Sequence, residues 1–195
     1  MIDEKKQSDS KNILELRGQF IGRAKQYLTT NPQARQKLAK SFGKSVEKVS
    51  TEELSYLFEV LSDEIYEKEH LNYKLNEKLN AYFFVLTMMA YYWKTLEEDD
   101  AVRMELVLNE LFHHSTDSTK KKIRTLIGDS FGSSGTFQAR LASITKQIHN
   151  MTNIDYFSLL NDLCSWNYCN GQRNVSKTCY NWSKNIFFKT EEEEL

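Results

Sequence analysis

Glycine and proline are scarce in this chain: its 195 residues include a single Pro and only 7 Gly. Folds built from β-strands change direction often and place Gly and Pro at the turns, so this scarcity favours helices. Hydrophobic residues make up 40% of the chain, with 11 Phe, 10 Tyr and 3 Trp, which is enough to form a buried core. A disordered chain has fewer apolar residues and a larger net charge. The sequence therefore predicts an all-α protein.

Apolar residues recur at helical spacing along most of the chain and are separated by capping signals. Asn31-Pro32 is typical of a helix start, and Ser50 with Glu53 has the spacing of a capping box. One amphipathic face is expected to run along residues 50–65. The most apolar stretch, residues 79–93, is shorter than the roughly 20 residues that cross a bilayer, so it predicts a helix buried among others. We expect eight or nine helices and no strand.

The acidic run at residues 97–100 is the clearest internal boundary and predicts two small packed bundles, 13–96 and 97–189. Residues 1–12 are polar and are expected to be disordered, and residues 190–195 form an acidic tail. The N-terminus lacks the apolar segment of a signal peptide, and three cysteines are an odd number for a disulfide framework. These features predict reduced thiols and a cytoplasmic location.

Charge is strongly segregated along the chain, although the formal net charge is only −1. Residues 11–48 contain nine Lys or Arg and two acids, whereas residues 49–70 contain seven acids and one Lys. Residues 101–189 are basic again, and their densest cluster is the KKKIR segment at 120–124. A cationic ridge of this kind suits phosphates rather than base edges. Basic regions on a small helical protein therefore indicate a nucleic-acid partner.

Motifs for catalysis, metals and cofactors are weak. The Gly-rich stretch 128–135 lacks the lysine and the preceding strand of a phosphate-binding loop. Glu67 and His70 have the spacing of half a di-iron site without the second half, and the cysteines lack paired C-x-x-C spacing. We therefore expect a protein that is not an enzyme and that uses neither a metal nor another cofactor.

Three short motifs follow one another in the C-terminal half: KKIRTLI at 121–127, IDY at 154–156 leading into a Leu-rich helix that ends at Trp166, and WSKNIF at 182–187. Their order and spacing resemble the small subunit (CasB-type) of Cascade, the type I-E CRISPR surveillance complex. Residues 20–43 resemble the opening helix pair of that family more loosely. The chain departs from the family pattern by Lys in place of Arg, by an apparent insertion at 169–173 and by its four-Glu tail.

This resemblance implies a non-catalytic, all-helical subunit present as two copies in a complex guided by crRNA. Its implied partners are the crRNA, both strands of the target DNA, the backbone and large subunits, and a second copy of itself, with no membrane. Such a subunit holds the guide–target heteroduplex and the displaced strand, while base pairing reads the sequence. The residues assigned to nucleic-acid backbone are Lys121, Lys122, Arg124, Lys37, Lys40, Lys184, Arg140 and Lys146. Trp166 and Trp182 are assigned to the core, because each lies on the apolar face of its helix.

Two other functions remain open from the sequence. A free-standing regulator of duplex DNA would place base-reading side chains on one recognition helix, whereas the basic residues here lie on several. An all-α enzyme would use the acidic segment 52–69, whose acids are interleaved with apolar residues and predict the solvated face of an amphipathic helix.

Overall fold

The computed structural model describes residues 2–71, 77–97, 100–129, 131, 135–148, 151, 153–166 and 176–188, with side chains from residue 12 onward. The described part is all-α, as predicted, and its single strand-like pairing is a bridge between Val102 and Ile154. Ten α-helices and two short 3-10 helices make up this part of the chain: α1 (Ile2–Thr30), α2 (Pro32–Lys40), η1 (Val46–Lys48), α3 (Thr51–Val60), α4 (Asp63–Lys68), α5 (Glu77–Tyr91), η2 (Trp93–Glu97), α6 (Met104–His114), α7 (Asp117–Gly128), α8 (Thr136–Thr145), α9 (Tyr156–Ser165) and α10 (Lys177–Phe187).

Helix boundaries differ from the prediction in two places. α1 begins at Ile2, inside the segment 1–12 that the composition predicts to be disordered. No Gly or Pro interrupts the chain before Gly18, so the helix continues backward from its apolar part. The face predicted along 50–65 is divided between α3 and α4, because Ser62 caps a new helix by accepting a hydrogen bond from the Ile65 N–H. Phe58 is consequently 46% exposed.

Local capping signals are otherwise reproduced. Ser50 and Glu53 form the predicted capping box at the start of α3, and Pro32 is the first residue of α2. At the start of α9, the carboxylate of Asp155 accepts a hydrogen bond from the Ser158 N–H at 2.9 Å. The acidic tail at 190–195 and the apparent insertion at 169–173 lie outside the described residues.

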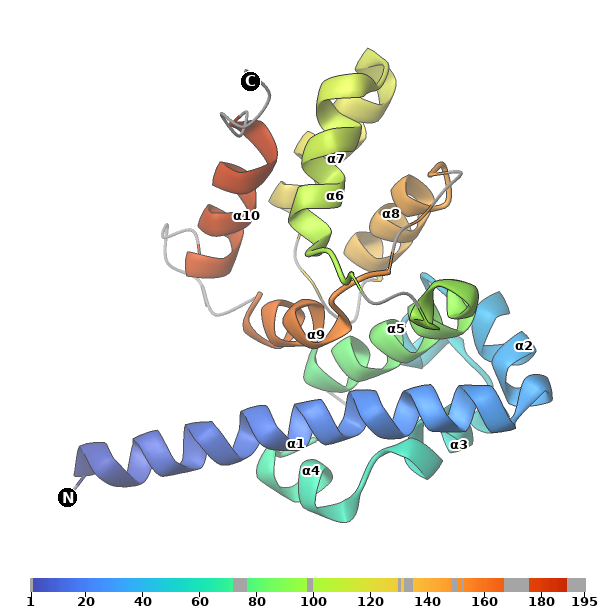
Figure 1. Ribbon diagram of the computed structural model, residues 1–195, viewed down its shortest axis with the longest axis vertical. Coiled ribbons are helices and arrows are strands. Elements are labelled where there is room, and N and C mark those ends of the chain that lie inside the picture. Colours follow the sequence, from blue (N-terminus) through green and yellow to red (C-terminus); the bar gives the residue numbers. More distant parts are fainter. Residues whose placement is uncertain are drawn as a thin grey trace.

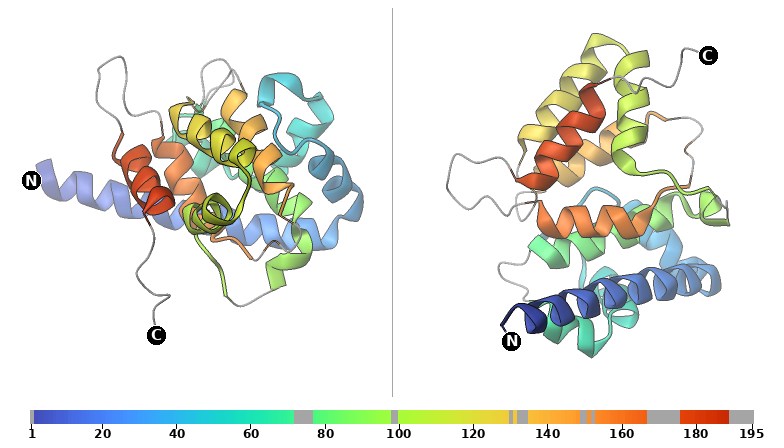
Figure 2. Two further views of the ribbon diagram at one scale, coloured as in Figure 1. Left: turned by 90° about the horizontal axis from the view of Figure 1, so that it is seen from above. Right: turned by 60° about the vertical axis from the view of Figure 1, so that its left-hand side comes forward.

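The helices are arranged in three tiers (Figures 1 and 2). α1 lies with α3 and α4 in the first tier, α5 and α9 lie side by side in the second, and α6, α7, α8 and α10 form the third. α5 is the central helix, with every residue from Leu79 to Ala90 buried, as its composition predicts. α9 packs against both α1 and α5, so one continuous apolar cluster runs through the two bundles expected at 13–96 and 97–189. None of the described helices combines the length and the apolarity needed to cross a bilayer.

The two tryptophans assigned to the core are buried next to each other. Their rings pack edge to face with centroids 4.9 Å apart, and Trp166 also packs on Phe137 of α8. Both indole N–H groups have partners, since that of Trp182 donates to Asp162 Oδ2 at 2.8 Å and that of Trp166 donates to the Asp129 carbonyl at 3.1 Å. Paired indoles of this kind fix α8, α9 and α10 relative to one another.

A buried ionic cluster joins the first two tiers. Glu69, only 2% exposed, accepts from Arg17 Nε at 2.6 Å and from Lys78 Nζ at 2.6 Å. Arg17 also donates to Asn161 Oδ1 of α9 at 2.9 Å, so the cluster links α1, α5 and α9 to the residue after α4. Glu69 therefore differs from the prediction that the acids of 52–69 form a solvated face.

The turn after α2 packs closely on α8. Gly43 has a φ of +94°, and a Cβ added there would lie 2.7 Å from the Cβ of Ala142. Only glycine combines this backbone conformation with so close an approach. The contact holds η1, with Lys48 at its end, beside the N-terminus of α8, where the candidate site lies.

Candidate nucleic-acid interface

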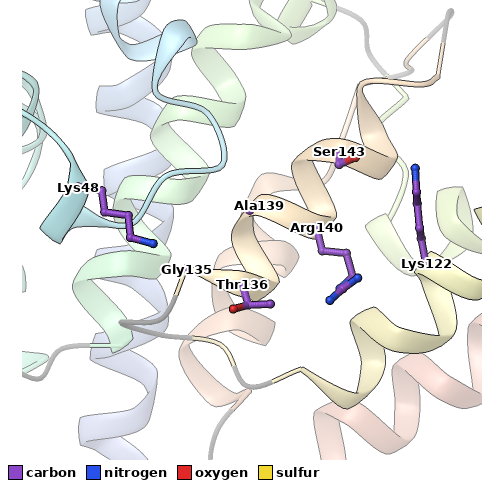
Figure 3. Close-up of a pocket in the computed structure, with 7 residues that line it drawn as sticks. All are labelled: Lys48, Lys122, Gly135, Thr136, Ala139, Arg140 and Ser143. Atoms are coloured by element: carbon purple, nitrogen blue, oxygen red, sulfur yellow. The ribbon is translucent and has the colours of Figure 1, made fainter.

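An open groove of about 460 Å³ crosses α8 between η1 and α7. It is lined by Lys48, Lys122, Gly135, Thr136, Ala139, Arg140 and Ser143. Figure 3 shows Lys48 on one side of α8 and Lys122 on the other, with Arg140 between them. Cations from three segments that are far apart in the sequence therefore surround one groove.

The groove floor is the exposed face of α8, and its residues are small. Thr136, Ala139 and Ser143 occupy this face, while Phe137 and Leu141 are buried on the opposite side. Short side chains on the floor leave room for a bulky anion to approach the helix. The long cationic side chains at the edges then lie where they reach such an anion.

The N-terminus of α8 opens into the same groove. Gly135 is the N-cap residue with a φ of +67°, and a glycine supplies no side-chain cap of its own. The unbonded N–H groups of a first helical turn carry partial positive charge and bind anions. Ser45 lies alongside: its buried hydroxyl has no hydrogen-bond partner among the described residues and is 3.6 Å from the Cβ position of Gly135. The helix end adds to the positive potential supplied by the lysines.

α7 supplies Lys122 because of its amphipathic pattern. Thr119, Ile123 and Leu126 are buried, which leaves Lys122 half-buried at the edge toward α8 and Lys121 exposed. Lys121 and Arg124 do not line the groove. Arg124 instead lies over the ring of Phe112, 5.0 Å from its centroid.

Arg140 has an acidic neighbour at the groove edge. Its Nε lies 2.6 Å from Oδ2 of Asp129, the residue after α7, and both side chains are partly exposed. Asp129 therefore occupies one side of the guanidinium and offsets part of its charge. The pair positions the guanidinium without neutralising the groove as a whole.

Lys146 extends the α8 face beyond the groove. It follows Ala139 and Ser143 at helical spacing, and its Nζ lies 5.1 Å from the ring centroid of Phe42 and 5.2 Å from that of Tyr91. The same Nζ donates to the Phe42 carbonyl at 3.4 Å. Arg140 in the middle of α8 and Lys146 just after its last residue are thus the basic residues next to this face.

The other predicted residues lie elsewhere. Lys37 is on α2 and forms a hydrogen-bonded ion pair with Glu52, whose carboxylate raises the pKa of Lys37. Lys40 is exposed in the last turn of α2, and Lys184 is exposed on α10. The eight predicted cations therefore do not form one site: Lys122 and Arg140 line the groove and Lys146 continues its face, while the remaining five are on other surfaces.

Lys48 is the groove residue that sequence reasoning missed. It is one of nine basic residues in 11–48, and no motif separates it from the others. Its place in the groove depends on Gly43, which packs the preceding turn against α8, nearly a hundred residues further along the chain. A contact of such sequence separation leaves no local signal.

Three acids of the segment 52–69 have structural partners. Glu52 pairs with Lys37, Glu53 completes the capping box of α3, and Glu69 is held by Arg17 and Lys78. In the part of the chain that the structure describes, no three His, Cys, Asp or Glu side chains lie close enough to hold a metal ion.

Asp129→Asn is expected to strengthen nucleic-acid binding about two- to fivefold at low salt, because it removes a negative charge 2.6 Å from Arg140. The measurement is fluorescence anisotropy of a labelled oligonucleotide. Asp117→Asn is the matched control, since it makes the same charge change at the other end of α7. Equal affinities of the two variants would show that Arg140 does not contact the ligand.

Comparison of the chain with protein-family models, with curated proteins and with solved structures gives no match to any of them.

Proposed function

We propose that this chain binds the phosphate backbone of nucleic acids without reading their sequence. The observation that carries the proposal is the convergence of Lys48, Lys122 and Arg140 on one open groove, whose floor consists of small residues and begins at the N-terminus of α8. Phosphodiesters are the common biological anion that presents charge in a repeating row. Lys48, Lys122 and Arg140 around the groove, with Lys146 beyond the end of α8, are placed to meet such a row.

Backbone contacts fit the groove better than base contacts. Lysine and arginine contact phosphates, whereas bases are identified by bidentate Arg, Asn or Gln on an element that enters a duplex groove. None of the described residues that line the groove is Asn or Gln, and Arg140 is held at its edge by Asp129. These features support positioning on a charged backbone over recognition of a sequence.

The narrower proposal is a non-catalytic small subunit of a crRNA-guided type I-E CRISPR complex, which stabilises the guide–target heteroduplex and the displaced strand. It rests on the order of the motifs between residues 120 and 188. It also rests on Lys122 and Arg140, two residues assigned to nucleic-acid backbone, which line the groove. In such a complex base pairing supplies the specificity, so a subunit that offers only charge and shape is sufficient. A second copy and larger subunits would be its partners in the cytoplasm.

The test of backbone binding compares three labelled oligonucleotides of equal length and unrelated sequence. Their dissociation constants are expected to agree within about threefold, because phosphate contacts carry no sequence information. A preference for one sequence by a hundredfold or more would instead favour the free-standing regulator, since base readout discriminates on that scale.

The narrower proposal has its own test. A tagged chain expressed in its native cell should co-purify with larger subunits and a uniform short RNA. Recovery of the chain with nucleic acid of mixed length and no larger subunit would contradict a role in such a complex, while leaving backbone binding in place.

A further inference from the structure

The outward face of α10 carries the two most exposed large apolar side chains of the described residues. Tyr180 is 62% exposed and Phe188 is 70% exposed, whereas the next, Phe58, is 46% exposed. Exposed aromatic rings are unfavourable in water, and an exposed apolar patch rimmed by polar residues marks a binding surface. Their neighbours on the helix indicate what binds there.

Lysines alternate with these aromatic side chains. Lys177, Tyr180 and Lys184 lie on one face of α10, opposite the buried Trp182 and Ile186, and the C-cap residue Phe188 follows them at the same spacing. No acidic residue occurs from 177 to 188. The face therefore combines positive charge and flat apolar rings, which we call the α10 stripe.

The α10 stripe is held rigidly. Trp182 anchors the helix on α9 through Asp162, and the hydroxyl of Ser176 caps its first turn. At the other end Asn109 Nδ2 of α6 donates to the carbonyl groups of Asn185 at 2.8 Å and Phe188 at 2.9 Å. Because the backbone is fixed at both ends, the helix itself does not need to be ordered when a ligand binds.

Further cations flank the C-terminal end of the α10 stripe. Phe187 packs on Phe112 with ring centroids 5.0 Å apart, and both Lys120 and Arg124 of α7 lie over that same Phe112 ring. The stripe is therefore continuous with the basic cluster of α7. The α10 stripe therefore adjoins the basic side of α7 and lies away from the acidic residues of the first tier.

We propose that the α10 stripe binds single-stranded nucleic acid by stacking bases on Tyr180 and Phe188 while Lys177 and Lys184 contact the phosphates. Aromatic side chains set among cations are the usual means of binding a single strand without sequence preference, because every base presents a π-face. The two rings are eight residues apart, or about 12 Å along the helix, which separates them enough to engage different bases. A duplex keeps its bases stacked inside, so it meets only the lysines. This inference rests on the proposed function, and it adds a second site with a preference for unpaired strands.

The test measures binding of a labelled oligothymidine and of a duplex of the same length by fluorescence anisotropy. Tyr180→Ala and Phe188→Ala are each expected to weaken oligothymidine binding about tenfold and to leave duplex binding unchanged. Phe188→Leu keeps the apolar character without the aromatic ring and should weaken binding in the same way. Tyr66→Ala is the matched control, because Tyr66 is an exposed aromatic residue on α4, outside the stripe.

A spectroscopic readout separates stacking from a general effect on the surface. Tyr180→Trp places an exposed indole in the α10 stripe, and its fluorescence should be quenched when oligothymidine binds. The inference would be overturned if both alanine variants bound oligothymidine with wild-type affinity, or if the indole fluorescence were not quenched at saturation. Either result would leave the groove proposal standing. Failure of the wild-type protein to bind either nucleic acid would overturn both.

Discussion

Glu69→Ala is expected to lower the free energy of unfolding by about 3–5 kcal/mol, because it leaves two cations in or near the core without their carboxylate. Arg17 has a side chain that is 10% exposed, and its Nε and Nη2 both contact Glu69 Oε1. Lys78 contacts the other carboxylate oxygen, and Tyr82 Oη donates to Oε1 at 3.3 Å. Domains of this size are stable by about 5–15 kcal/mol in total, so the loss is a large part of it. The measurement is the urea midpoint at neutral pH.

Glu67→Ala is the matched control. Glu67 is exposed on α4, two residues before Glu69, so its removal deletes the same charge without disturbing a buried partner. Its effect on the midpoint should be within about 0.5 kcal/mol of zero. Equal effects of the two substitutions would show that the ionic cluster does not stabilise the contact between α1 and α5.

The same cluster predicts a dependence on pH. Burial alone raises the pKa of Glu69, but the charges of Arg17 and Lys78 outweigh burial and hold this pKa below the ordinary carboxyl value. A carboxyl group with a lowered pKa in the folded state stabilises fully above its unfolded pKa, about 4.3, and loses that contribution as the pH falls through the folded value. The stability difference between wild type and Glu69→Gln should therefore shrink below about pH 4.3. A difference that grows with acid would contradict the assignment.

Charge reversal of the two lysines that line the groove from opposite sides is expected to weaken nucleic-acid binding on the order of a hundredfold. The variant is Lys48→Glu combined with Lys122→Glu, which replaces attraction of phosphates by repulsion from both η1 and α7. The loss should be the same for oligonucleotides of unrelated sequence. Anisotropy titrations of wild type and variant give the ratio directly, and unchanged circular dichroism confirms that the variant is folded.

Lys25→Glu combined with Lys68→Glu is the matched control for net charge. Both lysines are exposed in the first tier, on α1 and α4, and the total charge changes by the same amount. This variant should bind within about threefold of wild type, because exposed charges beyond about 10 Å are screened at ordinary ionic strength. Equal losses in both double variants would mean that net charge, and not the groove, governs binding.

Local features of the fold follow from short stretches of sequence. The capping box at Ser50, the proline start at Pro32 and the buried helix α5 each depend on residues within one or two turns, and each is found where it is predicted. The burial of Trp166 and of Trp182 follows from helical periodicity in the same way. Signals of this kind are local, so a single sequence contains them.

The remaining features depend on contacts between distant residues. The burial of Glu69 requires Arg17 from α1 and Lys78 from α5, and nothing near Glu69 distinguishes it from the exposed acids around it. Lys48 joins Lys122 and Arg140 only because Gly43 packs on Ala142. The chemistry of the candidate site, basic residues that contact phosphates, was therefore predictable. The particular residues that come together in the site were not.

Salt dependence of binding tests backbone recognition by the groove most directly. If Lys48, Lys122 and Arg140 each neutralise one phosphate of a duplex, the logarithm of the affinity should fall with the logarithm of salt concentration at a slope of about −3. The Lys48→Glu/Lys122→Glu variant should have a slope shallower by about two, because two of these contacts are lost. A slope that is the same in wild type and variant, or binding by wild type that does not change with salt, would contradict the account.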